Sequence, residues 1–180
     1  PELLERLDHL ERSRAARVPG GPPARGPDHR PDRGPDRGAS LDTDVVIAGG
    51  GLSLLLAPML AARGLRVTVV ERGTIGATHR EWNASGPELA ALVDSGLCSP
   101  AELEALIVAR YDRGVCRWHG GGSYTVRGVL DHAVDAGALL ALARARAIER
   151  GVVLLDHHEV LGEREGPGGV SVRIRKTSAS

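Results

Sequence analysis

The sequence predicts an α/β fold in which helices flank a parallel sheet. Two runs rich in valine and isoleucine, residues 44–48 and 66–71, surround a helix-like segment at 52–63. Three consecutive glycines at 49–51 separate the first run from that segment. A strand, a glycine-rich turn, a helix and a second strand form one βαβ unit, and such units build parallel sheets.

The composition fits a globular domain and excludes several classes of protein. The chain has 180 residues, and its 23 Lys and Arg balance its 23 Asp and Glu. A strongly basic nucleic-acid surface is therefore not expected, and no nucleic-acid partner is predicted. The two cysteines exclude a disulfide scaffold. The longest apolar stretch, 52–62, is too short to span a bilayer, and no signal peptide is recognised, so a cytoplasmic protein without a transmembrane segment is the default expectation.

The first 40 residues differ in kind from the rest. Residues 1–17 predict a short, charged helical segment. Residues 18–40 carry six of the eleven prolines, and three near-repeats at 27–38 alternate Asp and Arg without apolar side chains. Such a segment cannot bury enough surface to offset its ordering entropy, which predicts a disordered linker; a proline-rich ligand for a partner is the alternative. The folded domain is expected at 41–180.

Helices after the βαβ unit have clear start signals. Ser85 with Glu88 and Ser99 with Glu102 are capping boxes, and they predict helices at 86–95 and from 100 to about 110. The second helix would present Leu103, Leu106, Ile107 and Arg110 on one face. Asp135 is expected to cap a long helix at 136–150 that ends at Gly151.

Short strands are expected between and after these helices. Residues 115–118 and 124–126 surround the glycine turn at 120–122. Residues 152–155 form another apolar run of the parallel type, and 159–164 with 170–175 predict a β-hairpin. Val170, Val172 and Ile174 alternate with polar residues, so the second arm should have one solvated face.

The glycine turn at residues 49–51 is the strongest candidate for a binding site. Gly49 permits a tight turn, and Gly51 lets the backbone approach a diphosphate without an intervening Cβ. A helix N-terminus offers that diphosphate its free N–H groups. Glu71 ends the second strand and can accept hydrogen bonds from ribose hydroxyls, whereas a 2′-phosphate would favour arginine there. The pattern predicts an adenosine-dinucleotide site, with a plain glycine-rich turn as the alternative.

Two residues depart from the dinucleotide fingerprint. Leu54 stands where the third glycine is usual, so it should push the helix outward or repack it. Pro58 cannot bond the carbonyl of Leu54 and should kink the helix.

No metal site is predicted. His157 and His158 are adjacent and would face opposite ways on a strand, and Cys98 and Cys116 lack CxxC spacing.

No requirement of the fold explains the run Arg80-Glu81-Trp82-Asn83, which is expected in a loop after the second strand. The run resembles a signature of the CruA-type lycopene cyclases, a group of FAD-dependent oxidoreductases. The resemblance continues at 86–89, 92–97, 101–104, 126–130 and 133–135, and it extends over about 44–175.

The resemblance implies a two-domain flavoenzyme that binds FAD noncovalently, with NAD(P)H as a possible reductant. The carotenoid cyclases of this group use reduced flavin without net redox change to close an end ring on an apolar isoprenoid. Such an enzyme could contact a membrane peripherally through its substrate domain. The second FAD motif and most of that domain lie C-terminal in the family and are absent here, so the chain is expected to be an N-terminal part of such a protein.

The resemblance also implies roles for individual residues. Arg80 would pair with the pyrophosphate or the ribityl chain, and Trp82 would pack by the flavin or anchor its loop. Glu81 is the candidate catalytic acid, with a solvated carboxylate as the alternative. Val160 would offer backbone groups to the adenine. The expected cofactor-binding set is Gly49, Gly50, Gly51, Leu52, Glu71, Arg72, Arg80, Trp82 and Val160.

Three functions remain open from the sequence. The first is the FAD-binding portion of a lycopene-cyclase-like enzyme. The second is a generic FAD-dependent oxidoreductase or monooxygenase with another substrate. The third is an inactive remnant, which Leu54 and Pro58 would favour.

Overall fold

The computed structural model describes residues 42–77 and 82–177, all within one of the chain's two units, Arg37–Ser180. The expected N-terminal helix and linker lie outside the described residues. So do Arg80 and Glu81, the first two residues of the signature run.

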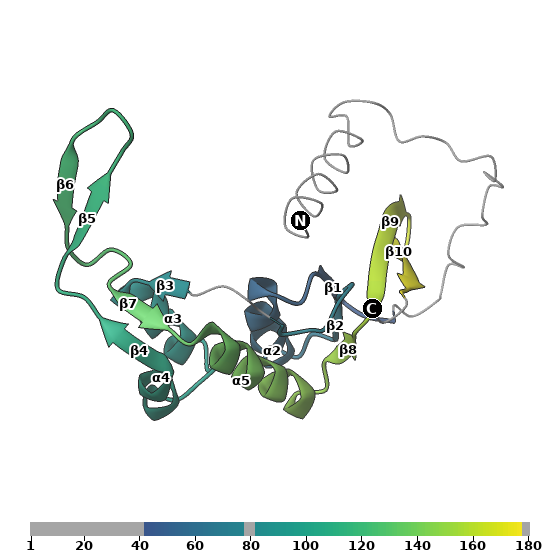
Figure 1. The fold of residues 1–180 in the computed structure, drawn as a ribbon. Helices are drawn as coiled ribbons and strands as arrows, with labels where there is room; N and C mark the ends of the chain where they lie inside the picture. Colours follow the sequence, from purple (N-terminus) through teal and green to yellow (C-terminus); the bar gives the residue numbers. More distant parts are fainter. Residues whose placement is uncertain (1–41, 78–81, 178–180) are drawn as a thin grey trace. The chain divides into compact units, whose positions relative to one another are not determined.

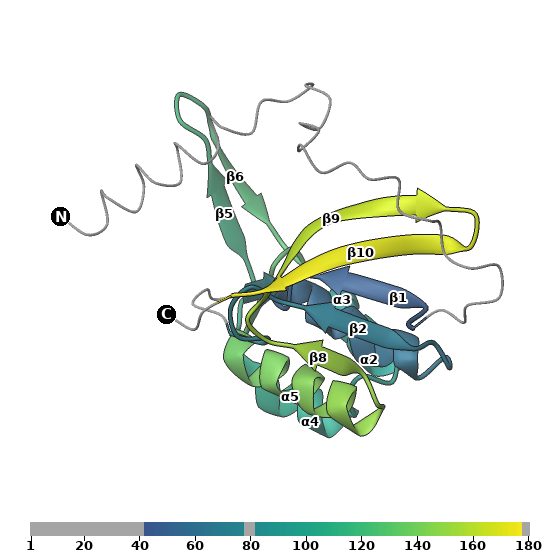
Figure 2. The same cartoon turned by 90° about the vertical axis from the view of Figure 1, so that its right-hand side faces the viewer.

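A three-stranded parallel sheet forms the centre of the fold. Its strands are β1 (Val45–Ala48), β2 (Val67–Val70) and β8 (Val153–Leu155), in the order β1-β2-β8. Val46 pairs with Thr68, and Val69 pairs with Leu154. The helices α2 (Leu56–Ala61) and α5 (Ala136–Glu149) contact each other and pack against this sheet (Figures 1 and 2). The predicted α/β fold class is confirmed.

The helix after the glycine turn is divided in two, whereas the sequence predicted one helix. It begins as the 3₁₀ helix η1 (Leu52–Leu55) and continues as α2. The change occurs beside Pro58, which lies in the first turn of α2, where an α-helix does not need the N–H that proline lacks. Gly64 ends the segment with φ of +85°, as expected.

Both capping boxes are confirmed. They begin α3 (Gly86–Asp94) and α4 (Pro100–Leu106). The N–H of Ser85 donates to Glu88 Oε2 over 2.8 Å, and the N–H of Ser99 donates to Glu102 Oε2 over the same distance. These backbone donors lower the pKa of both glutamates. Asp135 caps α5 through the N–H of Ala138, and Gly151 ends that helix.

A second sheet corrects two predictions. It consists of β3 (Trp82–Ala84), β7 (His132–Val134) and β4 (Ile107–Arg110), antiparallel in the order β3-β7-β4. Trp82 and Asn83, expected in a loop, pair with Val134 and Ala133. Ile107 and Arg110, expected on the second helix, belong to β4, where they pair with Val134 and His132 of β7.

Two hairpins complete the described residues. β5 (Gly114–Arg117) pairs with β6 (Ser123–Val126), and β9 (His158–Gly166) pairs with β10 (Gly169–Lys176). Both hairpins were predicted. The second arm differs in detail, because Val170 and Ile174 are exposed and neither face of β10 is fully covered.

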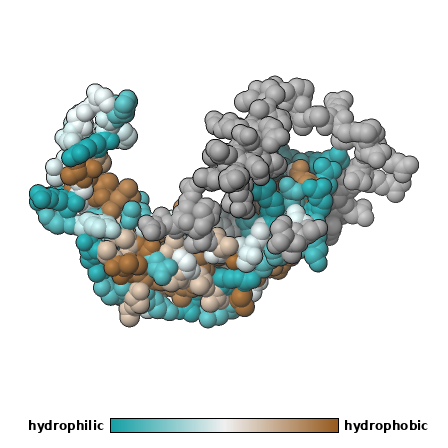
Figure 3. Space-filling view, viewed as in Figure 1, coloured by the Kyte–Doolittle hydropathy of each residue, from teal (hydrophilic) through white to brown (hydrophobic). Residues whose placement is uncertain are grey.

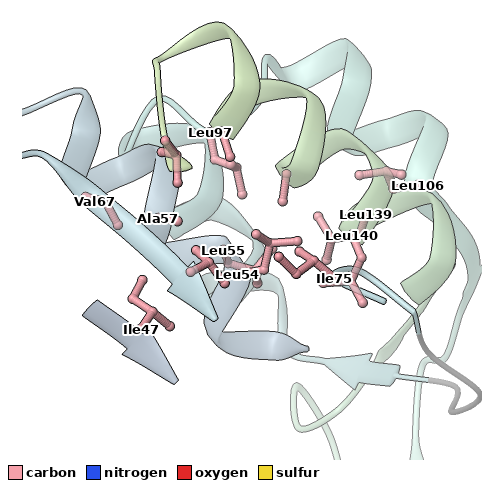
Figure 4. Packing of buried hydrophobic residues seen from close by; sticks show 14 of the residues in the cluster. Ile47, Leu54, Leu55, Ala57, Val67, Ile75, Leu97, Leu106, Leu139 and Leu140 are labelled. Atoms are coloured by element: carbon pink, nitrogen blue, oxygen red, sulfur yellow. The ribbon is translucent and has the colours of Figure 1, made fainter. Parts of the chain in front are cut away.

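Aliphatic side chains build the core. The most deeply buried, shown in part in Figure 4, include Leu54, Val69, Ile75, Leu97 and Leu140. No polar or charged residue is buried among the described residues. On the surface, apolar side chains are interspersed with polar ones (Figure 3). None of the described helices is long and apolar enough to cross a bilayer.

Candidate dinucleotide site

The carboxyl ends of the three parallel strands carry the candidate site. Gly49 follows β1, Glu71 follows β2 and Asp156 follows β8. Because β2 lies between β1 and β8, Glu71 stands between the other two residues along this edge. Open α/β sheets bind their ligands at the carboxyl ends of their strands.

The turn after β1 is tight, as predicted. Gly49 has φ of +105°, a value that favours glycine. Its N–H donates to Val70 O over 2.8 Å, and its carbonyl accepts from Ser53 Oγ over 2.6 Å. Gly49 is therefore fixed to β2 through its N–H and to the following helix through its carbonyl.

Gly51 faces open space. A Cβ built on Gly51 would have no heavy atom within 4 Å. In the first helical turn, the N–H groups of Gly51, Leu52 and Ser53 have no intrahelical acceptor. Free donors beside open space suit a diphosphate, and Leu52, 62 % exposed, lies at the same turn.

Glu71 is held beside this turn by two backbone donors. Its Oε2 accepts the N–H of Gly50 over 2.7 Å, and its Oε1 accepts the N–H of Gly73 over 2.8 Å. Each carboxylate oxygen retains a second lone pair that can accept a ribose hydroxyl. The turn and the acid are thus directly joined by a hydrogen bond.

Gly50 has the least room of the three glycines. A Cβ there would lie 2.9 Å from Ile75 Cγ1 and 3.1 Å from Glu71 Cβ. The carbonyl of Gly50 accepts the N–H of Gly76 over 2.8 Å. The turn therefore packs against the loop that follows β2, and only glycine fits at its centre.

Leu54 is repacked into the core, one of the two outcomes expected for this departure. It is fully buried, and its Cδ2 would lie 3.7 Å from a Cβ built on Gly76. Gly76 also approaches Leu140 O. Both are ordinary van der Waals contacts, so the φ of +83° at Gly76, rather than lack of space, favours glycine there.

The remaining predicted residues lie in different elements. Arg72 is exposed in the loop after β2, where its carbonyl accepts from Thr177 Oγ1. Val160 is half-buried in β9 and pairs with Ile174. Trp82 is half-buried and packs against the core from β3, so it fixes the chain after the undescribed residues 78–81.

The sequence analysis did not identify Asp156. Its Oδ1 accepts the N–H of Ile75 over 2.6 Å, and its Oδ2 accepts from Arg144 over 2.9 Å. The signal was an acid directly after the run 152–155, the position that Glu71 has after its own strand.

Other groups in the described ranges do not form a second site. No group of His, Cys, Asp and Glu could hold a metal there, and Cys98 and Cys116 are both free thiols. An open hollow of about 420 Å³ lies between the 96–102 segment and the end of α5. Its arginines already have partners: Arg146 pairs with Glu102 and Glu149, and Arg150 donates to the carbonyls of Pro58 and Gly96.

No protein-family model matches the chain, and no curated protein matches it. Solved structures do. The myxobacterial chondrochloren halogenase CndH, an FAD-dependent halogenase, matches 77 % of the chain at 20 % identity with a TM-score of 0.59. The p-nitrophenol 4-monooxygenase PnpA of Pseudomonas putida matches 72 % at 19 % identity with a TM-score of 0.52.

A geranylgeranyl bacteriochlorophyll reductase-like protein of Thermoplasma acidophilum matches 74 % of the chain at 16 % identity, with a TM-score of 0.55. The chain covers 34 %, 38 % and 35 % of the three solved chains, in the order given. It therefore spans about a third of their length. At these identities the likeness concerns the fold: the described residues have a Rossmann-type fold that is also found in FAD-dependent enzymes.

Proposed function

We propose that the chain carries the part of a flavin-dependent oxidoreductase that binds the ADP half of FAD. One observation carries the proposal: Glu71 accepts the N–H of Gly50, which joins the ribose-binding acid to the diphosphate turn at the carboxyl edge of the sheet. The likeness to FAD-dependent halogenases and monooxygenases supports FAD over other dinucleotides.

The described residues fit that half of the cofactor. The open space at Gly51 admits the diphosphate, and the first-turn N–H groups donate to its oxygens. The Glu71 carboxylate accepts from the adenosine ribose, and Val160 offers backbone groups to the adenine. FAD, when bound, supplies two-electron redox chemistry, with NAD(P)H as the proposed reductant. The chain itself binds and orients the adenosine end.

The finer proposal is a lycopene-cyclase-like activity on an apolar isoprenoid or carotenoid, at a site peripheral to a membrane. It is supported by the resemblance of the run at residues 80–83. Trp82 is described, and its packing against the core favours an anchor for this run. Arg80 would hold the pyrophosphate or ribityl chain, and Glu81 would handle a proton.

A generic FAD-dependent monooxygenase or halogenase is the second candidate. The specific observation that favours it is the fold likeness, because halogenases and monooxygenases are among the matched structures. Turnover on a lycopene-like polyene by Arg80→Lys, Trp82→Ala and Glu81→Gln variants of the full-length enzyme separates the two candidates. If turnover falls in Glu81→Gln with FAD affinity unchanged, the cyclase proposal is supported.

Binding of ADP and FAD to the purified chain tests the general proposal. Gly51→Val should abolish binding because its branched side chain would occupy the diphosphate approach, while the fold is largely retained. Glu71→Ala should weaken binding strongly. Glu163→Ala, an exposed carboxylate in β9, serves as the control and should bind normally. Unchanged affinity in Gly51→Val would mean that the glycine turn is structural only.

A further inference from the structure

Asp156 lies between two donors that come from different elements. Its Oδ1 accepts the N–H of Ile75, 81 residues earlier in the chain, and its Oδ2 accepts from the Arg144 guanidinium in α5. The side chain of Asp156 is 28 % exposed and that of Arg144 is 33 % exposed. Hydrogen bonds with an ionised partner are shorter and stronger than neutral ones, so this contact fixes Ile75 firmly.

Ile75 belongs to the loop that follows β2, and that loop forms one wall of the dinucleotide turn. Its neighbour Gly76 donates to the carbonyl of Gly50 over 2.8 Å. At its start, the N–H of Gly73 donates to Glu71 Oε1. The loop therefore contacts both the turn and the acid, and any shift of Ile75 moves both.

The residues next to Asp156 hold the same loop from the β8 side. The N–H of His157 donates to Gly73 O over 2.9 Å, and the N–H of His158 donates to Glu71 O over 2.8 Å. One oxygen of Asp156 accepts from the backbone of this loop and the other accepts from Arg144, so Asp156 connects the loop to α5.

We infer that Asp156 is a positioning residue for the adenosine-diphosphate site: it holds the loop of residues 72–76 so that Glu71 and Gly50 keep the arrangement that binds the ribose and the diphosphate. The inference rests on the proposed function. It assigns the carboxyl end of the third strand of the sheet a part in binding.

The chain contains a matched control for this contact. Asp44 also accepts a backbone N–H and an arginine side chain, both from Arg66, whose guanidinium donates through both Nε and Nη2. It precedes β1, at the opposite end of the strands from the dinucleotide turn. Asp44→Ala and Asp156→Ala thus remove the same kinds of hydrogen bond at opposite edges of one sheet.

The experiment measures the dissociation constants of ADP and FAD by calorimetry, together with the Tm of each variant. Asp156→Ala should bind ADP about tenfold more weakly, since losing a charged acceptor leaves Ile75 N–H and Arg144 without their partner. Asp44→Ala should lose a similar amount of Tm and bind ADP as the wild type does. Asp156→Asn retains an oxygen for Ile75 and should regain most of the affinity.

Equal ADP affinity in Asp156→Ala and the wild type, with a lowered Tm, would make Asp156 merely structural and overturn the inference. If Asp156→Ala does not fold, Arg144→Ala carries the test: it should weaken ADP binding about threefold, and unchanged affinity overturns the inference. If the wild-type chain binds neither ADP nor FAD, the proposed function itself fails. If the wild type and Asp156→Ala both bind ADP with equal affinity, only the inference about Asp156 fails.

Discussion

At the scale of single residues, Leu54 shows how a departure from a fingerprint is absorbed. The usual glycine at this position lets helix and strand approach closely. Here the side chain is fully buried in the core. The departure is visible in the sequence, but the choice between an outward shift and repacking is not, because η1 packs against α5, which lies far along the chain.

Leu54→Ala should lower the free energy of unfolding by about 3 kcal/mol, since it leaves a cavity in a well-packed core. Urea denaturation measures this loss. Leu56→Ala is the control, because Leu56 is 53 % exposed and its truncation should cost much less. Leu54→Gly should likewise bring no gain in ADP affinity. A gain would show that Leu54 impairs the site rather than supporting the core.

At the scale of elements, local signals predicted the structure well. The capping boxes at Ser85 and Ser99 and the cap at Asp135 are complete within four residues, so the starts of three helices follow from sequence. The sheet of β3, β7 and β4 was missed. Its strands have three or four residues and form through pairing between distant segments, which no local pattern encodes. For Asp156, the position after the apolar run 152–155 was a local signal, but its contact with Ile75 was not predictable because the two residues are 81 positions apart.

The salt bridge between Asp44 and Arg66 joins the amino ends of β1 and β2, and it should make the stability of the fold depend on pH. Hydrogen bonds from the Arg66 side chain and backbone lower the pKa of Asp44 from 3.8 to about 2. Because the pKa is lower in the folded state, this contribution is complete above about pH 4 and is lost as the pH falls toward 2. Thermal unfolding of wild type and Asp44→Asn across that range measures it.

The variant should be less stable than wild type at neutral pH, and the two should converge in Tm near pH 2. A difference in Tm that stays constant between pH 5 and pH 2 would contradict the assignment.

At the scale of the whole molecule, the two free thiols differ in accessibility, so only the reaction of the buried one should depend on unfolding. Cys116 is exposed in β5, whereas Cys98 is buried in the segment between α3 and α4. Burial raises the pKa of the Cys98 thiol, and Glu102 adds to the effect. A thiol reagent reacts with the thiolate, so access and ionisation both protect Cys98.

Labelling with a thiol reagent should therefore show two phases, one fast for Cys116 and one slow that follows unfolding around Cys98. In Cys116→Ser only the slow phase should remain, and urea should accelerate it. Rapid modification of Cys98 in native buffer would show that α3 and α4 open without unfolding of the core.

A Cβ at Gly50 would meet neighbouring atoms, whereas a Cβ at Gly51 would lie in open space, so the two positions should tolerate random substitution differently. A library selected only for folded protein should retain glycine at Gly50, where any Cβ meets Ile75 and Glu71, and should admit side chains more often at Gly51. A library selected for retention on an immobilised adenine nucleotide should require glycine at both. The difference between the two surviving populations would separate, within one tripeptide, the position that folding constrains from the position that the ligand constrains.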